Sequence, residues 1–116
     1  MSQRLEGKVA LVTGAAGYLG QSHCVHLARE GAKVVVTDIL DGSETVAAVE
    51  KENGEAIFLP LDVTDWEQAH AVVAETVKAF GRLDILVNNA ALTGGIIKPW
   101  TEFTPPGVGQ KLGGRP

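Results

Sequence analysis

Short apolar runs alternate along the chain with longer segments in which apolar and polar residues are mixed. Runs in which nearly every position is apolar are typical of parallel strands that are buried on both faces of a sheet. The predicted strands cover residues 8–13, 33–38, 56–61 and 83–88. Pro60 has no N–H to give to a neighbouring strand, so it predicts that the 56–61 strand lies at an edge of the sheet.

The first two segments between these strands have the pattern of helices that end in glycine. Residues 18–30 are followed by Gly31, and residues 44–53 are followed by Gly54. Glycine readily adopts the left-handed backbone conformation that closes many helices. We therefore expect both glycines to adopt it.

The third segment carries the clearest helix pattern. Thr64 is followed three residues later by Glu67, which predicts a capping box at the start of the helix. Apolar residues then recur at helical spacing until Gly81, which predicts an amphipathic helix. These apolar residues are Trp66, Val73, Val77 and Phe80.

The alternation of strands and helices gives the order βαβαβαβ. Right-handed crossovers wind this order into an α/β fold of the Rossmann type, a truncated, doubly wound parallel sheet with strand order 3-2-1-4. We expect this domain to cover residues 1–104. Residues 105–116 are mostly Pro and Gly without periodicity, so we expect an irregular, disordered tail. The abrupt change near Pro105 favours a frameshift or an aberrant terminus.

Composition and charge narrow the class of protein. The chain has 116 residues, of which 45% are hydrophobic and 21% charged, as in a single globular domain. A net charge of −4 without a Lys/Arg cluster predicts no nucleic-acid partner. No apolar run approaches the ~18 residues of a membrane span, so we expect no membrane partner. The single cysteine, Cys24, and a start without a secretory signal predict a cytoplasmic protein.

Three glycines mark the turn between the first strand and the first helix. Gly14, Gly17 and Gly20 lie in the segment TGAAGYLG. In such a turn one glycine allows the sharp bend, another lets the backbone approach a pyrophosphate, and a third lets the helix pack close to the strand. The helix then presents its free N–H groups and positive dipole end to the phosphates. This strand-turn-helix context predicts a dinucleotide-binding loop.

Asp38 ends the second predicted strand, about 20 residues beyond the glycines, where a carboxylate reaches the ribose hydroxyls of a dinucleotide. A 2′-phosphate about 4 Å from this carboxylate would be repelled by roughly 1 to 4 kcal/mol. The positions that could offer a compensating cation hold Ala15, Ala16, Ile39 and Leu40. We therefore predict NAD as the cofactor. The alternative, that Asp38 only caps a turn, stays open.

These features resemble the short-chain dehydrogenase/reductase family over residues 5–104. The matching segments are GKVALVTGAAGYLG, Asp38, LDVTD at 61–65 and ILVNNAA at 85–91. The resemblance implies that Asp62 binds the adenine amino group and that Asn88 to Ala91 support the sheet beside the adenosine ribose. The cofactor-binding residues expected in all are Gly14, Ala16, Gly17, Tyr18, Leu19, Gly20, Asp38, Ile39, Asp62, Val63, Asn89 and Ala90.

Two departures from the family pattern bear on the branch of the family. The Asn-Asn-Ala-Gly turn has Ala91 as its fourth residue, and the loop has Gly17 one residue early with Tyr18 where glycine is usual. This loop spacing is similar to that of the extended branch, which includes nucleotide-sugar epimerases. Because that branch usually lacks the Asn-Asn-Ala turn, we favour the classical branch with a variant loop and expect Tyr18 to lie beside the pyrophosphate.

A third departure concerns catalysis. The catalytic residues of the family are a Ser, a Tyr, a Lys four residues after that Tyr, and an Asn. The single tyrosine here, Tyr18, is followed four residues later by Ser22, so no Tyr-x-x-x-Lys is present. The resemblance implies an NAD-dependent oxidoreductase of an alcohol or ketone, and we expect this chain alone to be inactive. The alternatives are a non-catalytic nucleotide-binding or interaction module, or a fragment of an extended-type member.

The sequence predicts no metal site and leaves self-association open. His23, Cys24 and His26 lie close together, but no carboxylate completes a set of ligands, so we expect no metal. The 83–88 strand has no following strand pattern to cover its edge. An uncovered edge favours pairing with another copy, which leaves a homo-oligomer open.

Overall fold

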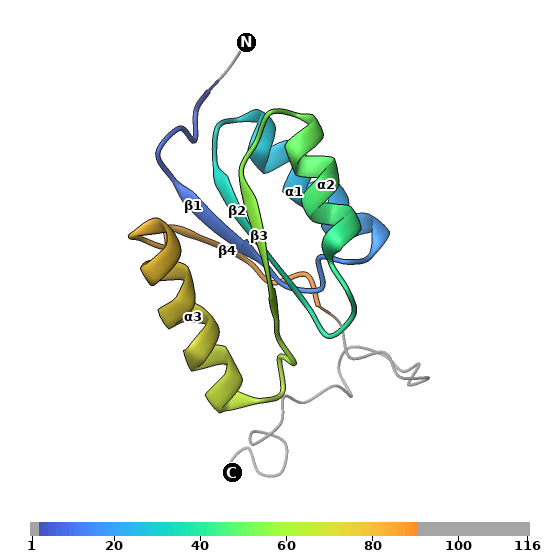
Figure 1. The fold of residues 1–116 in the computed structure, drawn as a ribbon, viewed down its shortest axis with the longest axis vertical. Coiled ribbons are helices and arrows are strands. Elements are labelled where there is room, and N and C mark those ends of the chain that lie inside the picture. The colour runs from blue at the N-terminus through green and yellow to red at the C-terminus, as the bar shows by residue number, and fades with distance from the viewer. Residues whose placement is uncertain (1–2, 91–116) are drawn as a thin grey trace, which may run out of the picture.

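The computed structural model describes residues 3–90. A four-stranded parallel sheet with the order β3-β2-β1-β4 forms its centre, as Figure 1 shows. The strands are β1 (Val9–Val12), β2 (Lys33–Asp38), β3 (Ala56–Pro60) and β4 (Ile85–Val87). The predicted fold class and strand order are thus confirmed. The expected domain end at 104 and the expected tail at 105–116 lie outside the described residues.

Helices cover both faces of the sheet (Figure 1). Helices α1 (Tyr18–Arg29) and α2 (Ser43–Lys51) lie on one face, and α3 (Trp66–Phe80) lies on the other. Within residues 3–90, none of these helices has the length and apolar character needed to cross a bilayer.

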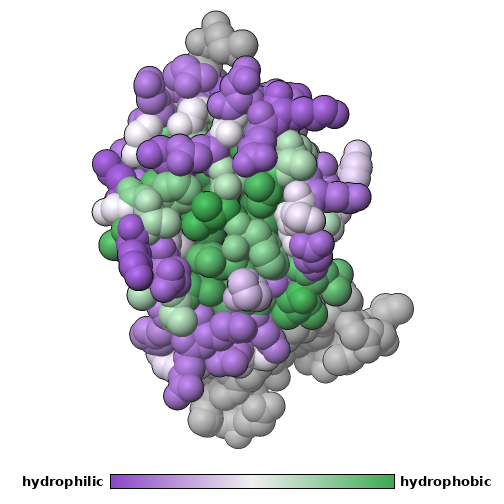
Figure 2. Space-filling view, viewed as in Figure 1, coloured by the Kyte–Doolittle hydropathy of each residue, from purple (hydrophilic) through white to green (hydrophobic). Residues whose placement is uncertain are grey.

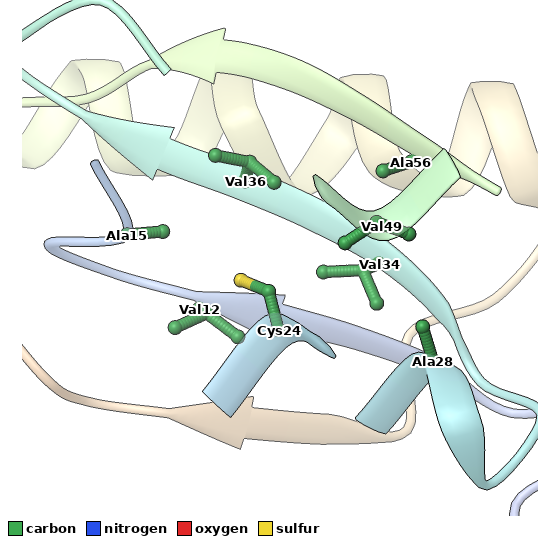
Figure 3. Packing of buried hydrophobic residues seen from close by; sticks show 8 residues of the cluster. All are labelled: Val12, Ala15, Cys24, Ala28, Val34, Val36, Val49 and Ala56. Carbon is green, nitrogen blue, oxygen red and sulfur yellow. The ribbon is translucent and has the colours of Figure 1, made fainter. Parts of the chain in front are cut away.

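The two inner strands supply the core to both faces. Val34 and Val36 belong to the hydrophobic cluster under α1 and α2, whereas Val35 belongs to the cluster under α3. Successive residues of a strand point to opposite faces, so one apolar run serves both layers. Cys24 points from α1 into the first cluster (Figure 3), and burial raises the pKa of its thiol to about 12. The thiol therefore stays protonated and acts as a small apolar side chain.

The outer strands are less buried than their apolar sequences predict. Ile57 and Leu59 of β3 are half-buried, and Leu86 of β4 is 64% exposed. β3 and β4 are the edges of the described sheet, as Pro60 predicts for β3. Apolar surface is accordingly visible in the middle of the face in Figure 2, over the strands between α2 and α3.

β4 is also shorter than the predicted 83–88 strand. Before Ile85 the pairing with β1 is shared between backbone and side chain: the Asp84 amide donates to the Val9 carbonyl at 2.9 Å, and Asp84 Oδ2 accepts a hydrogen bond from the Val9 amide at 2.9 Å. The Arg82 guanidinium and the Val9 amide hold the pKa of the Asp84 carboxyl below its usual range. The start of the strand is therefore fixed by a charged side chain, which an apolar pattern cannot show.

The helix ends follow the prediction in one case and depart from it in another. Gly31 has a φ of 99°, the expected left-handed conformation. After α2 the left-handed residue is Asn53, with a φ of 62°, and not Gly54. Asparagine tolerates this conformation. Gly54 is needed for packing instead, since a Cβ there would lie 2.8 Å from Val49 Cγ1.

The N-cap of α3 lies one residue after the predicted one, and Gln68 Oε1 accepts a hydrogen bond from the Asp62 amide rather than closing a capping box. Asp65, not Thr64, is the N-cap, and its carboxylate accepts a hydrogen bond from the Gln68 amide at 3.0 Å. Thr64 instead donates its hydroxyl to Asp62 at 2.6 Å. A carboxylate at the cap also interacts favourably with the positive end of the helix dipole.

The buried face of α3 also differs from the apolar stripe that predicts the helix. Trp66 is 76% exposed, and Val73 and Val77 are also exposed. The buried residues are Val72 and Thr76. Burial of Thr76 is possible because its hydroxyl donates to the Val72 carbonyl at 2.8 Å, so the polar group is satisfied within the helix.

The glycine turn between β1 and α1 is closely packed. A Cβ on Gly14, whose φ is 62°, would lie 2.8 Å from Ala90 Cα. A Cβ on Gly20 would collide with the Gly14 carbonyl oxygen and lie 2.6 Å from Ala15 Cα. At Gly17 the nearest atom would be 3.9 Å away. Gly14 and Gly20 therefore allow close contacts of the backbone, whereas Gly17 faces open space.

Removal of the α3 cap tests its position. Asp65→Ala should lower the free energy of unfolding by about 1 kcal/mol, because the Gln68 amide loses its acceptor. Thr64→Ala should cost less than about 0.5 kcal/mol, as at other exposed positions. Urea unfolding of both variants measures the difference, and a larger loss for Thr64→Ala would restore the predicted capping box.

The packing of the glycine turn is tested by a second pair of variants. Gly20→Ala should destabilise the fold by about 3 kcal/mol, because the added carbon meets backbone atoms that cannot move freely. Gly17→Ala should cost less than about 1 kcal/mol, since only the capping preference changes. Thermal unfolding compares the two, and equal stabilities would contradict the described turn.

Candidate functional site

A cavity of about 450 Å³ lies at the carboxyl ends of the strands. Parallel strands end at the same edge of a sheet. From β1 the chain continues on one side, to β2 and β3, and later returns to the other side of β1 as β4. A crevice opens at such a reversal of strand order. Its lining comes from the segments that follow all four strands. The lining residues are Gly14, Gly17, Asp38, Ile39, Leu40, Leu61, Asp62, Val63, Asn89 and Ala90.

Most of the expected cofactor-binding residues meet at this cavity. The exceptions are Ala16, Tyr18, Leu19 and Gly20, which belong to the adjoining glycine turn and the start of α1. Leu40 and Leu61 also line the cavity, although the sequence analysis did not count either among the cofactor-binding residues. Both directly neighbour an expected residue in the sequence, Ile39 and Asp62, and that adjacency is the signal that could have identified them.

Asp38 connects the end of β2 to the glycine turn. Its Oδ2 atom accepts a hydrogen bond from the Ala16 amide at 2.9 Å, and its Oδ1 atom accepts one from the Leu40 amide at 2.9 Å. The residue is 9% exposed. The bond to Leu40 is the turn cap that was the alternative for this residue. A carboxylate has about four acceptor positions, so capping leaves capacity for further donors from the cavity.

The turn after β4 supports the glycine turn from the other side. Asn89 donates from Nδ2 to the Gly14 carbonyl at 3.1 Å. The Thr13 hydroxyl accepts hydrogen bonds from the amides of Asn89 and Ala90, at 2.9 and 3.0 Å. These bonds explain how Ala90 lies close enough to Gly14 to exclude a side chain there.

The N-terminus of α1 has no side-chain cap. Gly17 is the N-cap residue, and the first turn contains no acidic residue. Tyr18 and Leu19, the first two helical residues, are 93% and 60% exposed. Uncapped N–H groups and the positive end of the helix dipole make such a terminus suitable for an anion.

Asp62 and two apolar side chains form another part of the cavity. The hydroxyl and amide of Thr64 both donate to Asp62 Oδ1, at 2.6 and 2.9 Å. These bonds hold the pKa of Asp62 below its usual range, so the carboxylate is ionised at neutral pH. Ile39 and Val63 are 72% and 40% exposed, which offers apolar surface next to a hydrogen-bond acceptor.

A larger hollow of about 750 Å³ lies at the opposite end of the sheet, where α1 and α2 end. Four of its six charged lining residues form ion pairs: Arg29 contacts Glu52 at 3.0 Å, and Lys33 contacts Glu55 at 3.9 Å. The C-termini of helices carry the negative end of the dipole. This hollow therefore suits an anionic ligand less well than the smaller cavity does.

Histidine and cysteine do not form a metal site in the described part of the chain. Residues 3–90 bring together no group of three or more potential metal-binding His, Cys, Asp or Glu side chains. Cys24 lies in the core, and His26 Nδ1 lies 2.8 Å from the carbonyl of Ser22. His70, on α3, contacts Trp66 edge to face.

The comparisons with known proteins agree on one family. The family model for short chain dehydrogenases matches residues 8–107. The trans-4-hydroxycyclohexanecarboxylate dehydrogenase of Sinomonas cyclohexanicum is 46% identical over 101 residues, which cover 79% of this chain and 39% of that protein. An uncharacterised NAD-dependent oxidoreductase of Mycobacterium tuberculosis is 43% identical, with 78% of this chain and 38% of that protein covered.

A solved structure shows the same similarity in three dimensions. The carveol dehydrogenase of Mycobacterium avium, determined in complex with NAD, superposes with a TM-score of 0.74 at 34% sequence identity. The match covers 78% of this chain and 38% of that protein, so the chain spans about two fifths of the length of the relatives it matches. On the family match and these similarities, the chain belongs to the short-chain dehydrogenase/reductase family.

Proposed function

We propose that this chain is the NAD(H)-binding part of an oxidoreductase that transfers hydride between NAD(H) and an alcohol or carbonyl substrate. The proposal rests on one observation. The uncapped N-terminus of α1 and Asp38 lie together at a cavity on the carboxyl edge of the sheet. The NAD complex of the related carveol dehydrogenase supports it.

The pyrophosphate would be held by backbone amides at the start of α1. Gly17, Tyr18, Leu19 and Gly20 would supply these amides, and the open space at Gly17 would allow an oxygen to approach the backbone. The exposed Tyr18 ring would lie beside the phosphates. No cationic side chain is required, because the helix dipole and the N–H groups supply the positive potential.

The adenosine half would occupy the cavity beyond Asp38. Asp38 would accept hydrogen bonds from the ribose hydroxyls, and Asp62 would accept one from the adenine amino group. The exposed apolar faces of Ile39 and Val63 would contact the adenine ring. The turn at Asn89 and Ala90 would border the ribose, and Ala16 would hold the Asp38 carboxylate in place.

The lining of the cavity favours NAD over NADP. A 2′-phosphate about 4 Å from Asp38 would be repelled by roughly 1 to 4 kcal/mol. No Lys or Arg is among the residues that line the cavity in the described part of the chain. No cationic side chain of the lining would therefore offset the repulsion.

The chain supplies coenzyme binding but no family proton donor. Bound NAD(H) supplies the hydride acceptor or donor of the reaction. The only tyrosine, Tyr18, is not followed by a Lys four residues later. Proton transfer and substrate positioning would therefore depend on residues other than these, and we propose that the 116 residues alone do not turn over substrate.

We also propose a cytoplasmic location and self-association. The lone, buried Cys24 is typical of a reducing compartment. Within residues 3–90 the outer edge of β4 pairs with no other strand, and Leu86 on it is 64% exposed. An edge of this kind favours pairing with another copy of the chain.

Coenzyme titration of two variants tests the proposal. The unmodified chain should bind NADH at least about fivefold more tightly than NADPH. Asp38→Ala should weaken NADH binding at least about tenfold, because hydrogen bonds to a charged acceptor are lost, and should reduce the preference over NADPH. Isothermal titration calorimetry measures both affinities, with circular dichroism confirming the fold.

Asp41→Ala is the matched control. Asp41 lies three residues further along, carries the same charge and accepts hydrogen bonds from Ser43 outside the cavity. Its removal should leave NADH affinity unchanged. Equal affinities of the two variants, or no binding by the folded unmodified chain, would rule out the proposed role of Asp38.

A further inference from the structure

One peptide group of the glycine turn is held at both of its polar ends. The carbonyl of Ala15 accepts a hydrogen bond from the Thr45 hydroxyl at 2.7 Å. The N–H of the same peptide group belongs to Ala16 and donates to Asp38 Oδ2 at 2.9 Å. The plane of this peptide is therefore fixed between α2 on one side and the end of β2 on the other.

The bond from Thr45 crosses between elements. A buried threonine within a helix commonly bonds to a carbonyl of its own preceding turn, as Thr76 does with Val72 in α3. Thr45 lies in the first turn of α2 and sends its hydroxyl to Ala15, 30 residues earlier in the chain. Both residues are 0% exposed, so water could not replace the Thr45 hydroxyl as the partner of the Ala15 carbonyl if that hydroxyl were removed.

The preceding peptide group is held in the same manner. Asn89 donates to the Gly14 carbonyl at 3.1 Å, and the Ala15 amide donates to the Thr37 carbonyl at 2.9 Å. Two successive peptide planes are thus fixed before the chain reaches Gly17. The direction of the uncapped amides at the start of α1 depends on these two planes.

We propose that Thr45 is a positioning residue of the nucleotide site, an inference that rests on the proposed function. By fixing the Ala15 carbonyl, Thr45 directs the Ala16 N–H at Asp38 Oδ2 and keeps the carboxylate oriented toward the cavity. Thr45 is not among the residues that line the cavity, so it acts through the backbone and through Asp38.

The central test compares two isosteric substitutions. Thr45→Val keeps the volume and removes the donor, and it should weaken NADH binding about three- to tenfold. Thr76→Val removes an equally buried hydroxyl whose only partner in the described residues is within α3. It should leave NADH affinity unchanged even if it lowers the melting temperature. Calorimetric titration gives the affinity and thermal unfolding gives the stability.

A second pair of variants separates the hydroxyl from the methyl group and covers the case in which Thr45→Val does not fold. Thr45→Ser and Thr45→Ala both lack the methyl group and differ only in the donor. The serine variant should bind NADH within about twofold of the unmodified chain, and the alanine variant should bind about three- to tenfold more weakly than the serine variant. Equal affinities would overturn the positioning role.

Coupling to Asp38 provides a readout that a merely structural role would not change. If Thr45 acts through the Asp38 carboxylate, Thr45→Val should weaken NADH binding less in the Asp38→Ala background than in the unmodified chain. Additive effects would overturn the inference. Absence of NADH binding by the folded unmodified chain would instead overturn the proposed function, so the two failures are distinguishable.

Discussion

The hydrogen bond from the Ala16 amide to Asp38 joins the two parts of the sequence on which the site depends. It links the turn after β1 to the end of β2, and Asp38 also lines the cavity. Stability of the turn and recognition of a ribose would therefore draw on the same oxygen atoms. The close packing of Gly14 against Ala90 completes the arrangement, because it holds the turn after β4 at the same edge of the sheet.

Much of this arrangement could be predicted from the sequence because its signals are local. The apolar runs of β1 and β2 are buried on both faces, so hydrophobicity alone identifies them. The glycine turn and Asp38 then follow from their places after those two strands. The strand order follows from the handedness of crossovers, which does not depend on individual side chains.

The remaining features depend on contacts that have no local signature. Thr64 and Asp65 are both residue types that commonly cap a helix such as α3. Asp65 is the N-cap because the Thr64 hydroxyl donates to Asp62 instead. Burial of Thr76 in α3 is possible because its hydroxyl bonds to the Val72 carbonyl, while the more apolar Val73 is exposed. The bond from Thr45 to Ala15 spans 30 residues and two elements, so no pattern along the chain could indicate it.

The most direct test of the account is a map of backbone amide chemical shifts when NADH is added to the isotopically labelled chain. Binding at the carboxyl edge predicts that the largest changes fall at residues 16–20, 38–40, 62–63 and 89–90, with little change at 51–55. The hollow at the other end of the sheet serves as the internal reference. Changes confined to residues 51–55, or no changes in a folded chain, would contradict the account.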